Sequence, residues 1–258
     1  MPENSQTQPL VSVVTVAFNA LEGLKATVAS VAKQSFRSVE HIVIDGGSDD
    51  GTREYLSSLG DGVRWLSEPD RGIADALNKG LAMARGEYIL VLQAEDTFVD
   101  ADSLTRAAPH LRGKTEIVSF AILLGGKTRV SRGFGPRTRL HPPFFHQGVF
   151  CRASLFERLG RFDTGLSISM DYEFFVRAYL AGASSMILRE PIANMPPTGV
   201  SSQLDWPALE RRLAENRRIH FRHAGQPAAK LFYFVYWLAY PLFKRVRSVL
   251  DKRKRERH

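Results

Sequence analysis

The sequence predicts an α/β protein in which a mostly parallel central sheet is flanked by helices. Four apolar runs support this prediction, at residues 10–18, 39–44, 63–66 and 87–92. Between them lie segments whose apolar residues recur at helical spacing. Strands that alternate with helices in this way form parallel sheets through right-handed crossovers.

The elements of the first half follow in a regular order. Residues 10–18 are apolar almost throughout, as in a strand buried on both faces, and helical spacing follows over 21–31. The second strand leads into a loop at 45–52 that is dense in acids and glycines, and a short helix follows near 53–58. The third strand precedes a helix that starts near Ile73, and Gly86 ends that helix before the fourth strand.

Acidic and polar side chains follow these strands at Asn19, Asp45, Asp70 and the adjacent pair Glu95 and Asp96. In open α/β sheets, ligands bind just outside the carboxyl ends of the strands. The pair Glu95 and Asp96 is suited to a hard cation, although Asp is also favoured in turns and helix caps. No glycine-rich lysine loop is present, so phosphates bound here would need a metal ion to neutralise them.

The second half is less regular. We expect a strand at 117–124, a basic excursion at 127–140, a helix that starts near 153 and a strand at 186–188. Asp171 opens a helix, where it is either a functional carboxylate or an N-cap. His146 is either a site residue or a semi-buried structural histidine.

Composition limits the function. The 258 residues include one cysteine, Cys151, which excludes an internal disulfide, fits a reducing compartment and is expected in the core. The net charge is +8, but residues 244–258 carry eight basic and two acidic residues and leave only +2 for the remaining 243. A nucleic-acid partner is therefore not expected. The polar first nine residues do not form a signal peptide, so we expect no export by that route.

Six segments together resemble the family 2 glycosyltransferases of the GT-A fold, especially bacterial enzymes of polysaccharide and lipid-linked sugar synthesis. The GT-A fold is a Rossmann-like nucleotide-diphospho-sugar transferase fold. The matching segments occur in the same order and spacing, at residues 13–19, 44–52, 68–80, 93–98, 146–150 and 170–173.

The resemblance implies a role for each matching site residue. It implies that Asp96 is the ligand of Mg²⁺ or Mn²⁺ and that Asp171 is the catalytic base. His146 and Gln147 lie between the donor half and Asp171 in the chain, so we expect them on the acceptor side. The sequence departs from the family pattern at two places. The segment Ala94-Glu95-Asp96 is not a literal D-x-D motif, and Phe18 stands where Tyr is common. The nucleotide-sugar-binding residues implied are Thr15, Ala17, Phe18, Asn19, Asp45, Asp75, Asn78 and Glu95.

The implied activity is transfer of a sugar from a nucleoside diphosphate, expected to be UDP, to a hydroxyl of a glycan or lipid-linked acceptor, with inversion at the anomeric carbon. The alternative is a GT-A-like protein without turnover that tethers a partner to the membrane. We assign residues 1–225 to the GT-A domain, with a donor half at about 10–98 and an acceptor half at about 115–205. The loop at 199–203 is a candidate lid over the donor.

The C-terminal segment, residues 226–258, is aromatic and then basic. Residues 231–243 are uncharged, yet too few to span a bilayer, which takes about 20 apolar residues. Aromatic residues and a basic run suit the headgroup region of an anionic membrane. We therefore expect a cytoplasmic protein held on the inner face of the cell membrane. The alternative is a helix packed on the domain and followed by a solvated tail.

Overall fold

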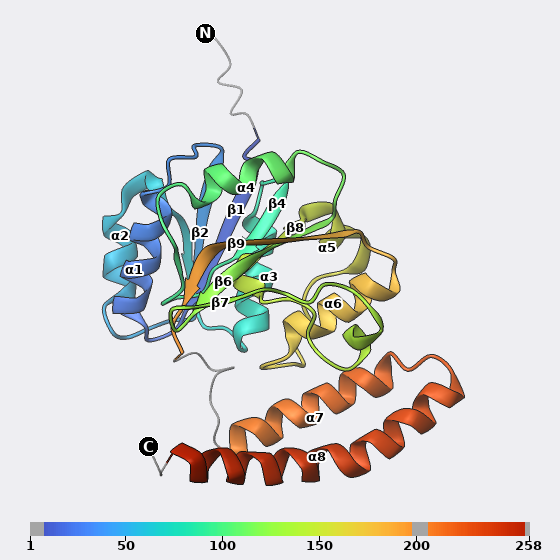
Figure 1. The fold of residues 1–258 in the computed structure, drawn as a ribbon. Helices are drawn as coiled ribbons and strands as arrows, with labels where there is room; N and C mark the ends of the chain where they lie inside the picture. The colour runs from blue at the N-terminus through green and yellow to red at the C-terminus, as the bar shows by residue number, and fades with distance from the viewer. Residues whose placement is uncertain (1–7, 198–205, 256–258) are drawn as a thin grey trace. The chain divides into compact units, whose positions relative to one another are not determined.

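The computed structural model describes residues 8–197 and 206–255, with side chains described as far as residue 245. The chain divides into two compact units, Met1–Pro197 and Thr198–His258. The first unit contains the sheet, and the second contains two long helices (Figure 1).

The first half of the first unit has the expected alternation of strands and helices. Its strands are parallel and adjacent in the order β3-β2-β1-β4. Hydrogen-bonded register aligns Ala17 with Asp45 and Asp45 with Ser67, so the carboxyl ends of β1, β2 and β3 meet at one edge. The elements are β1 (Val11–Ala17), α1 (Leu21–Ala32), β2 (Val39–Asp45), α2 (Thr52–Ser58), β3 (Arg64–Ser67), α3 (Ile73–Met83) and β4 (Tyr88–Val91).

The second half changes the direction of the sheet. The strand next to β4 is β8, which runs antiparallel to it; β6 follows, antiparallel to β8, and then β9, parallel to β6. The fold class is confirmed, with a mixed sheet whose first four strands are parallel. The remaining elements are β5 (Thr97–Phe98), α4 (Ser103–Leu111), β6 (Ile117–Leu124), β7 (Lys127–Arg129), β8 (Val149–Arg152), α5 (Ala153–Leu159), α6 (Met170–Leu180) and β9 (Ser185–Met195), with 3-10 turns η1 (Gly60–Gly62), η2 (Pro136–Arg139) and η3 (His146–Gly148).

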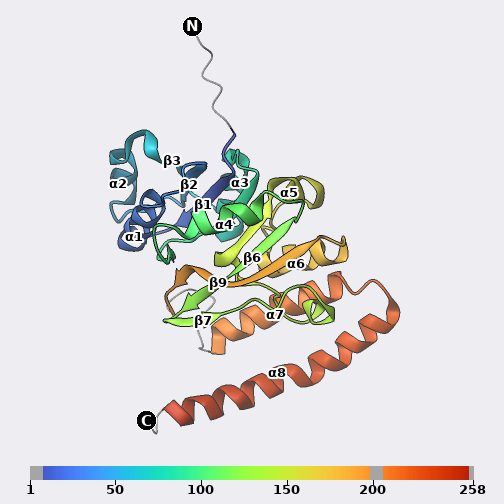
Figure 2. The same ribbon diagram turned by 45° about the horizontal axis from the view of Figure 1, so that its top comes forward.

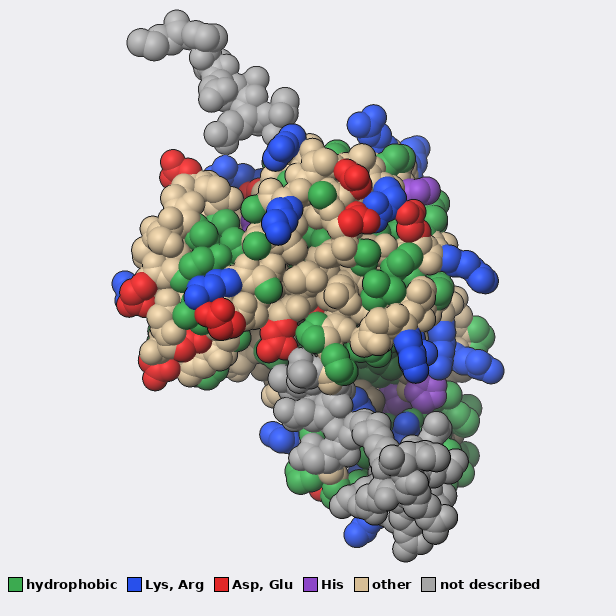
Figure 3. Space-filling model, turned by 60° about the vertical axis from the view of Figure 1, so that its left-hand side comes forward, with side chains coloured by type: hydrophobic (Ala, Val, Ile, Leu, Met, Phe, Trp, Pro, Cys, Tyr) green, Lys and Arg blue, Asp and Glu red, His purple; other side chains and the backbone are tan. Residues whose placement is uncertain are grey.

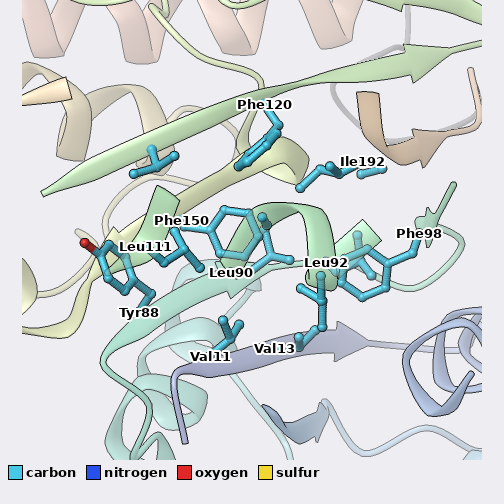
Figure 4. Packing of buried hydrophobic residues seen from close by; sticks show 14 of the residues in the cluster. Val11, Val13, Tyr88, Leu90, Leu92, Phe98, Leu111, Phe120, Phe150 and Ile192 are labelled. Atoms are coloured by element: carbon cyan, nitrogen blue, oxygen red, sulfur yellow. The ribbon is translucent and has the colours of Figure 1, made fainter. Parts of the chain in front are cut away.

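One large hydrophobic core joins the two halves of the sheet (Figure 4). Side chains of β1 and β4 pack with those of β6, β8 and β9 under helix α4. Tyr88 is fully buried, and its hydroxyl donates to the carbonyl of Thr115 at 2.7 Å. The labelled core residues in Figure 4 are Val11, Val13, Tyr88, Leu90, Leu92, Phe98, Leu111, Phe120, Phe150 and Ile192.

Helices cover both faces of the sheet (Figures 1 and 2). Helices α1 and α4 contribute Val31 and Leu104 to the core on one face. Helix α3 lies on the other face, where a Cβ on Gly80 would come within 2.4 Å of the Val14 side chain. A glycine therefore allows the close approach of α3 to β1. Cys151 is a buried core residue on β8, as expected.

The second unit consists of α7 (Trp206–Arg222) and α8 (Pro227–Arg255). The two helices pack through aromatic rings: Trp237 Nε1 lies 3.1 Å from His220 Nδ1, and Tyr233 stacks on His220. We expected a boundary at residue 225, whereas the chain divides after Pro197, and α7 packs on α8 in the second unit. Among the described helices, none combines the length and the hydropathy needed to cross a bilayer.

Candidate active site

The direction of β8 brings two distant turns to the same edge of the sheet. Leu90 of β4 pairs with Phe150 of β8, and the strands run in opposite directions. The turn that follows β4 therefore lies beside η3, which precedes β8. The first turn carries Asp96, and η3 carries His146 and Gln147.

A tight turn presents Glu95 and Asp96. The amide of Asp96 donates to the carbonyl of Gln93 at 3.0 Å, and Glu95 has a left-handed backbone with a φ of 81°. The turn packs against α1, where a Cβ on Gly23 would lie 2.5 Å from Glu95 Cγ. The hydroxyl of Thr27 on the same helix donates to the carbonyl of Asp96 at 2.8 Å. The acidic pair thus lies in a turn, and α1 holds that turn in place.

Asp96 is the buried carboxylate of the site, with 5% of its surface exposed. Burial raises its pKa to about 6, although the charge of His146 and hydrogen bonds from the Gln93 amide and the Gln147 side chain act in the opposite direction. Its negative charge is therefore only partly compensated by the protein. A bound cation would complete that compensation.

Asp171 lies in the first turn of α6, one residue beyond the helix start. Ser169 occupies the N-cap position, so Asp171 is not the N-cap. Its Oδ2 lies 3.3 Å from His146 Nδ1, and its side chain is 27% exposed. A carboxylate that is accessible in this way can take a proton from a bound hydroxyl group.

His146 lies between the two carboxylates. Burial alone would lower the pKa of His146, but the hydrogen bond and charge of Asp171, together with the charge of Asp96, raise it above the usual value. Its Nε2 atom is buried and has no hydrogen-bond partner among the described residues. The imidazole thus has a fixed contact on one side and an unused polar atom on the other.

A second cluster forms at the ends of β1 and β2, around the buried carboxylate of Asp45. It accepts hydrogen bonds from the amide of Ser48 at 3.1 Å and the hydroxyl of Ser67 at 2.7 Å, and also from the Ser48 hydroxyl. Asn19 has a positive φ of 48°, and its amide donates to the Ser48 hydroxyl at 2.8 Å. These bonds join the end of β1 to the loop after β2.

An exposed aromatic ring lies beside this cluster. Phe18 is 65% exposed directly after β1, where Ala17 ends the strand. A Cβ on Gly46 would lie 3.3 Å from the Phe18 ring and 2.6 Å from Asp70 Oδ2. The absence of a side chain at Gly46 therefore keeps the space between the ring and the carboxylate open. An exposed ring beside open backbone is suited to stacking on a planar base.

Three predicted donor-side residues have other partners. The buried Thr15 hydroxyl lies 2.9 Å from His41 Nε2, inside the sheet. Asp75 pairs with Arg71 at 3.2 Å, and hydrogen bonds from Arg71 lower the pKa of Asp75. The Asn78 side chain binds both the amide and the carbonyl of Phe162, at 3.0 and 2.9 Å. Their contact with a nucleotide stays a prediction.

The donor atoms fit a divalent cation held jointly with a substrate. No group of three His, Cys, Asp or Glu side chains within the described part of the chain is placed to hold a metal ion. Mg²⁺ in proteins is usually bound by one or two carboxylates, with substrate phosphates and water completing its shell. The buried, under-compensated carboxylate of Asp96 meets that requirement.

Sequence reasoning missed Gly23 and Thr27, which support the acidic turn from α1. A buried threonine within an otherwise apolar helix face was the only available signal. The candidate lid at 199–203 lies outside the described residues.

The sequence model of "Glycosyl transferase family 2" matches residues 12–175. An uncharacterized glycosyltransferase of Mycobacterium tuberculosis is 36% identical over 228 residues, covering 83% of this chain and 86% of the relative. The chain belongs to glycosyl transferase family 2 and is a glycosyltransferase. A PGL/p-HBAD biosynthesis glycosyltransferase of Mycobacterium bovis is 28% identical over 180 residues, covering 66% of this chain and 70% of the relative.

Solved structures share the GT-A fold. The mannosyltransferase PcManGT from Pyrobaculum calidifontis, in complex with GDP-Man and Mn²⁺, matches with a TM-score of 0.61 at 20% identity, over 96% of this chain and 85% of that chain. S. aureus TarS 1-349 in complex with UDP matches with a TM-score of 0.63 at 16% identity, over 83% of this chain and 65% of that chain. The family and the GT-A fold are thus both confirmed.

Proposed function

We propose that this glycosyltransferase transfers a sugar from a nucleoside diphosphate, most simply UDP, to a hydroxyl of a glycan or lipid-linked acceptor in cell-surface polysaccharide synthesis. One observation carries the proposal: a buried carboxylate, Asp96, and an accessible one, Asp171, are both held by the turn at His146 and Gln147. The exposed ring of Phe18 beside Gly46 supports a nucleotide site at the ends of β1 and β2.

In this proposal, Asp96 binds Mg²⁺ or Mn²⁺ together with the diphosphate of the donor. When bound, the ion supplies Lewis-acid stabilisation of the charge that develops on the leaving diphosphate. The Mn²⁺ in the related mannosyltransferase structure supports the use of a divalent ion.

Asp171 accepts the proton of the acceptor hydroxyl while the hydroxyl oxygen attacks the anomeric carbon. The bond from that carbon to the diphosphate breaks as the new glycosidic bond forms, so the configuration inverts in a single displacement. The accessibility of Asp171 supports this role, because a base must come within hydrogen-bonding distance of its substrate.

A screen of nucleotide sugars with Mn²⁺, in which release of nucleoside diphosphate is measured, tests the proposal. We expect release with one donor class, loss of transfer but not of donor binding in Asp171→Asn, and loss of metal-dependent donor binding in Asp96→Ala. Turnover near the wild-type rate in Asp171→Asn would contradict the role of the base. No turnover with any donor would favour the non-catalytic alternative.

We further propose that α8 attaches the protein to the cytoplasmic face of the membrane as a peripheral protein. Tyr233 and Trp237 face α7, whereas a set of large apolar residues on the same helix is more than half exposed. Interfacial helices bury such a face among lipid headgroups. The exposed set comprises Leu231, Phe232, Phe234, Val235, Leu238, Leu242 and Phe243.

Sedimentation with anionic phospholipid vesicles tests the attachment. We expect the double variant Phe234→Ser/Leu238→Ser to remain in the supernatant, while wild type and the control Glu210→Ser, at an exposed site on α7, sediment with the vesicles. Equal sedimentation of all three proteins would contradict the proposal.

On the face shown in Figure 3, acidic and basic side chains of the first unit are interspersed, which does not favour a nucleic-acid partner.

A further inference from the structure

We propose that the turn at His146 and Gln147 is a two-armed positioning element that sets the separation of the two carboxylates: Gln147 orients Asp96, and His146 orients Asp171. This inference rests on the proposed function of those carboxylates and assigns roles to two residues that do not themselves react.

Each arm has a separate partner. The Gln147 side chain hydrogen-bonds to the carboxylate of Asp96 and is itself buried, with 3% of its surface exposed. The His146 imidazole contacts Asp171 through Nδ1 at 3.3 Å. Because these residues are consecutive, their backbone links the buried carboxylate after β4 to the accessible carboxylate on α6.

The backbone of this turn has little freedom. Turn η3 packs against β4, β6 and β9. A Cβ on Gly148 would lie 2.5 Å from the carbonyl oxygen of Phe120, so the turn fits directly against the backbone of β6. The amide of Gly148 also donates to the carbonyl of Phe145 at 3.1 Å. Both arms therefore extend from a fixed platform.

The same segment is also attached to the helix that carries Asp171. The buried ring of Phe144 packs edge-on against Phe175 of α6, with centroids 4.9 Å apart. Phe144 lies two residues before His146, and Phe175 lies one helical turn beyond Asp171. The aromatic contact thus keeps α6 at the distance at which the imidazole reaches the carboxylate.

The two arms should affect different steps. Outer partners of ligands commonly change metal affinity or activity by about 10- to 100-fold when removed. We expect Gln147→Leu to weaken Mn²⁺ binding in the presence of UDP by about 10-fold or more. We expect His146→Leu to lower kcat by about 10-fold or more while Mn²⁺ affinity and donor KM stay within about threefold of wild type.

The decisive experiment measures both quantities on one set of variants. Mn²⁺ binding to the protein with UDP is followed by the electron paramagnetic resonance signal of free Mn²⁺, and kcat and KM are measured with the donor found in the screen. His146→Asn, whose amide can donate from a position near Nδ1, should recover most of kcat. His110→Leu, the same chemical change at an exposed site on α4, serves as the control.

A double variant separates positioning from general damage to the fold. If His146 acts through Asp171, His146→Leu should cause no further loss of rate in an Asp171→Asn background. The inference would be overturned if the rate losses of the two single variants multiplied in the double variant. It would also be overturned if His146→Leu and Gln147→Leu each reduced Mn²⁺ binding and kcat to the same extent. An inactive wild type that also fails to bind Mn²⁺ with UDP would instead overturn the proposed function. Should His146→Leu not fold, failure of the folded His146→Asn protein to retain kcat would count against the proposal.

Discussion

Replacing Asp96 with Asn should stabilise the metal-free protein while removing its metal binding. The native-state pKa of Asp96 is raised from 3.8 to about 6, so the native state binds this proton more tightly than the unfolded state does. The stability that the protonated form provides is present below pH 3.8 and is lost as the pH rises through 6. Asn is neutral at every pH and escapes this loss, while its carbonyl can still accept the hydrogen bonds of Asp96.

The size of the effect follows from the shift. A shift of about two pKa units corresponds to about 3 kcal/mol in the free energy of unfolding at pH 7.5, falling to about 1 kcal/mol at pH 4.5. Urea denaturation of both proteins with EDTA at these two pH values measures the difference. Adding Mn²⁺ and UDP should then raise the melting temperature of wild type and leave that of Asp96→Asn unchanged.

Asp45→Asn is the matched control. Asp45 is also buried, but its carboxylate accepts hydrogen bonds from Ser48 and Ser67. An amide has only one acceptor oxygen and would lose some of these hydrogen bonds, which should lower the free energy of unfolding by about 1–3 kcal/mol. The two substitutions should therefore change the free energy of unfolding in opposite directions. An Asp96→Asn protein that is less stable than wild type, or whose advantage does not depend on pH, would refute the reasoning.

Three further substitutions test other contacts. Thr27→Val keeps the side-chain shape but removes the hydroxyl bonded to the Asp96 carbonyl, so urea denaturation should show a loss of about 1–3 kcal/mol; no loss would mean that water replaces the bond. Gly148→Ala places a Cβ against the Phe120 carbonyl, so it should lower the free energy of unfolding by about 1–3 kcal/mol and also reduce transfer activity. An unchanged melting temperature would show that the turn can move. Burial lowers the pKa of His41 to about 4, so its neutral form stabilises the fold above pH 6.5, and that stability is lost as the pH falls toward 4. His41→Gln should therefore lose less stability than wild type between pH 7 and 4.5. Parallel losses of the two proteins in urea denaturation would argue against a buried neutral His41.

The first half of the fold could be predicted because its strands, apart from the half-buried edge strand β3, are largely buried on both faces. Such strands give continuous apolar runs, and the polar loops after them mark the edge where ligands bind. The second half lacks this pattern. Strand β8 is four residues long and continues directly into α5, while β5 has only two residues. Helix α4 contains Pro109 and was not expected. Strand β9 continues to Met195, beyond the expected end at residue 188, through Pro191.

The candidate site was predictable in its residues but not in its connections. The positions of Asp96, His146 and Asp171 follow from the resemblance to the family, yet no pattern in the sequence indicates that the imidazole contacts Asp171. That contact depends on how α6 packs against the segment before η3, where Phe144 meets Phe175. The approach of η3 to Asp96 depends in turn on pairing between β4 and β8, which are separated by more than fifty residues. Likewise, the support from Thr27 depends on how closely α1 approaches the acidic turn.

The reversed direction of β8 also bears on protein engineering. Residues 130–148 leave the sheet after β7, which pairs with β6, and return to it at the start of β8, so both ends of this excursion are attached to the same sheet. A graft that replaces residues 130–140 would keep the strands on either side and the first four parallel strands, but it would have to restore the contacts of Ser131 with Ser119 and Phe145. The chain therefore offers an exchange point for building chimeric enzymes in which the four parallel strands of the first half stay unchanged.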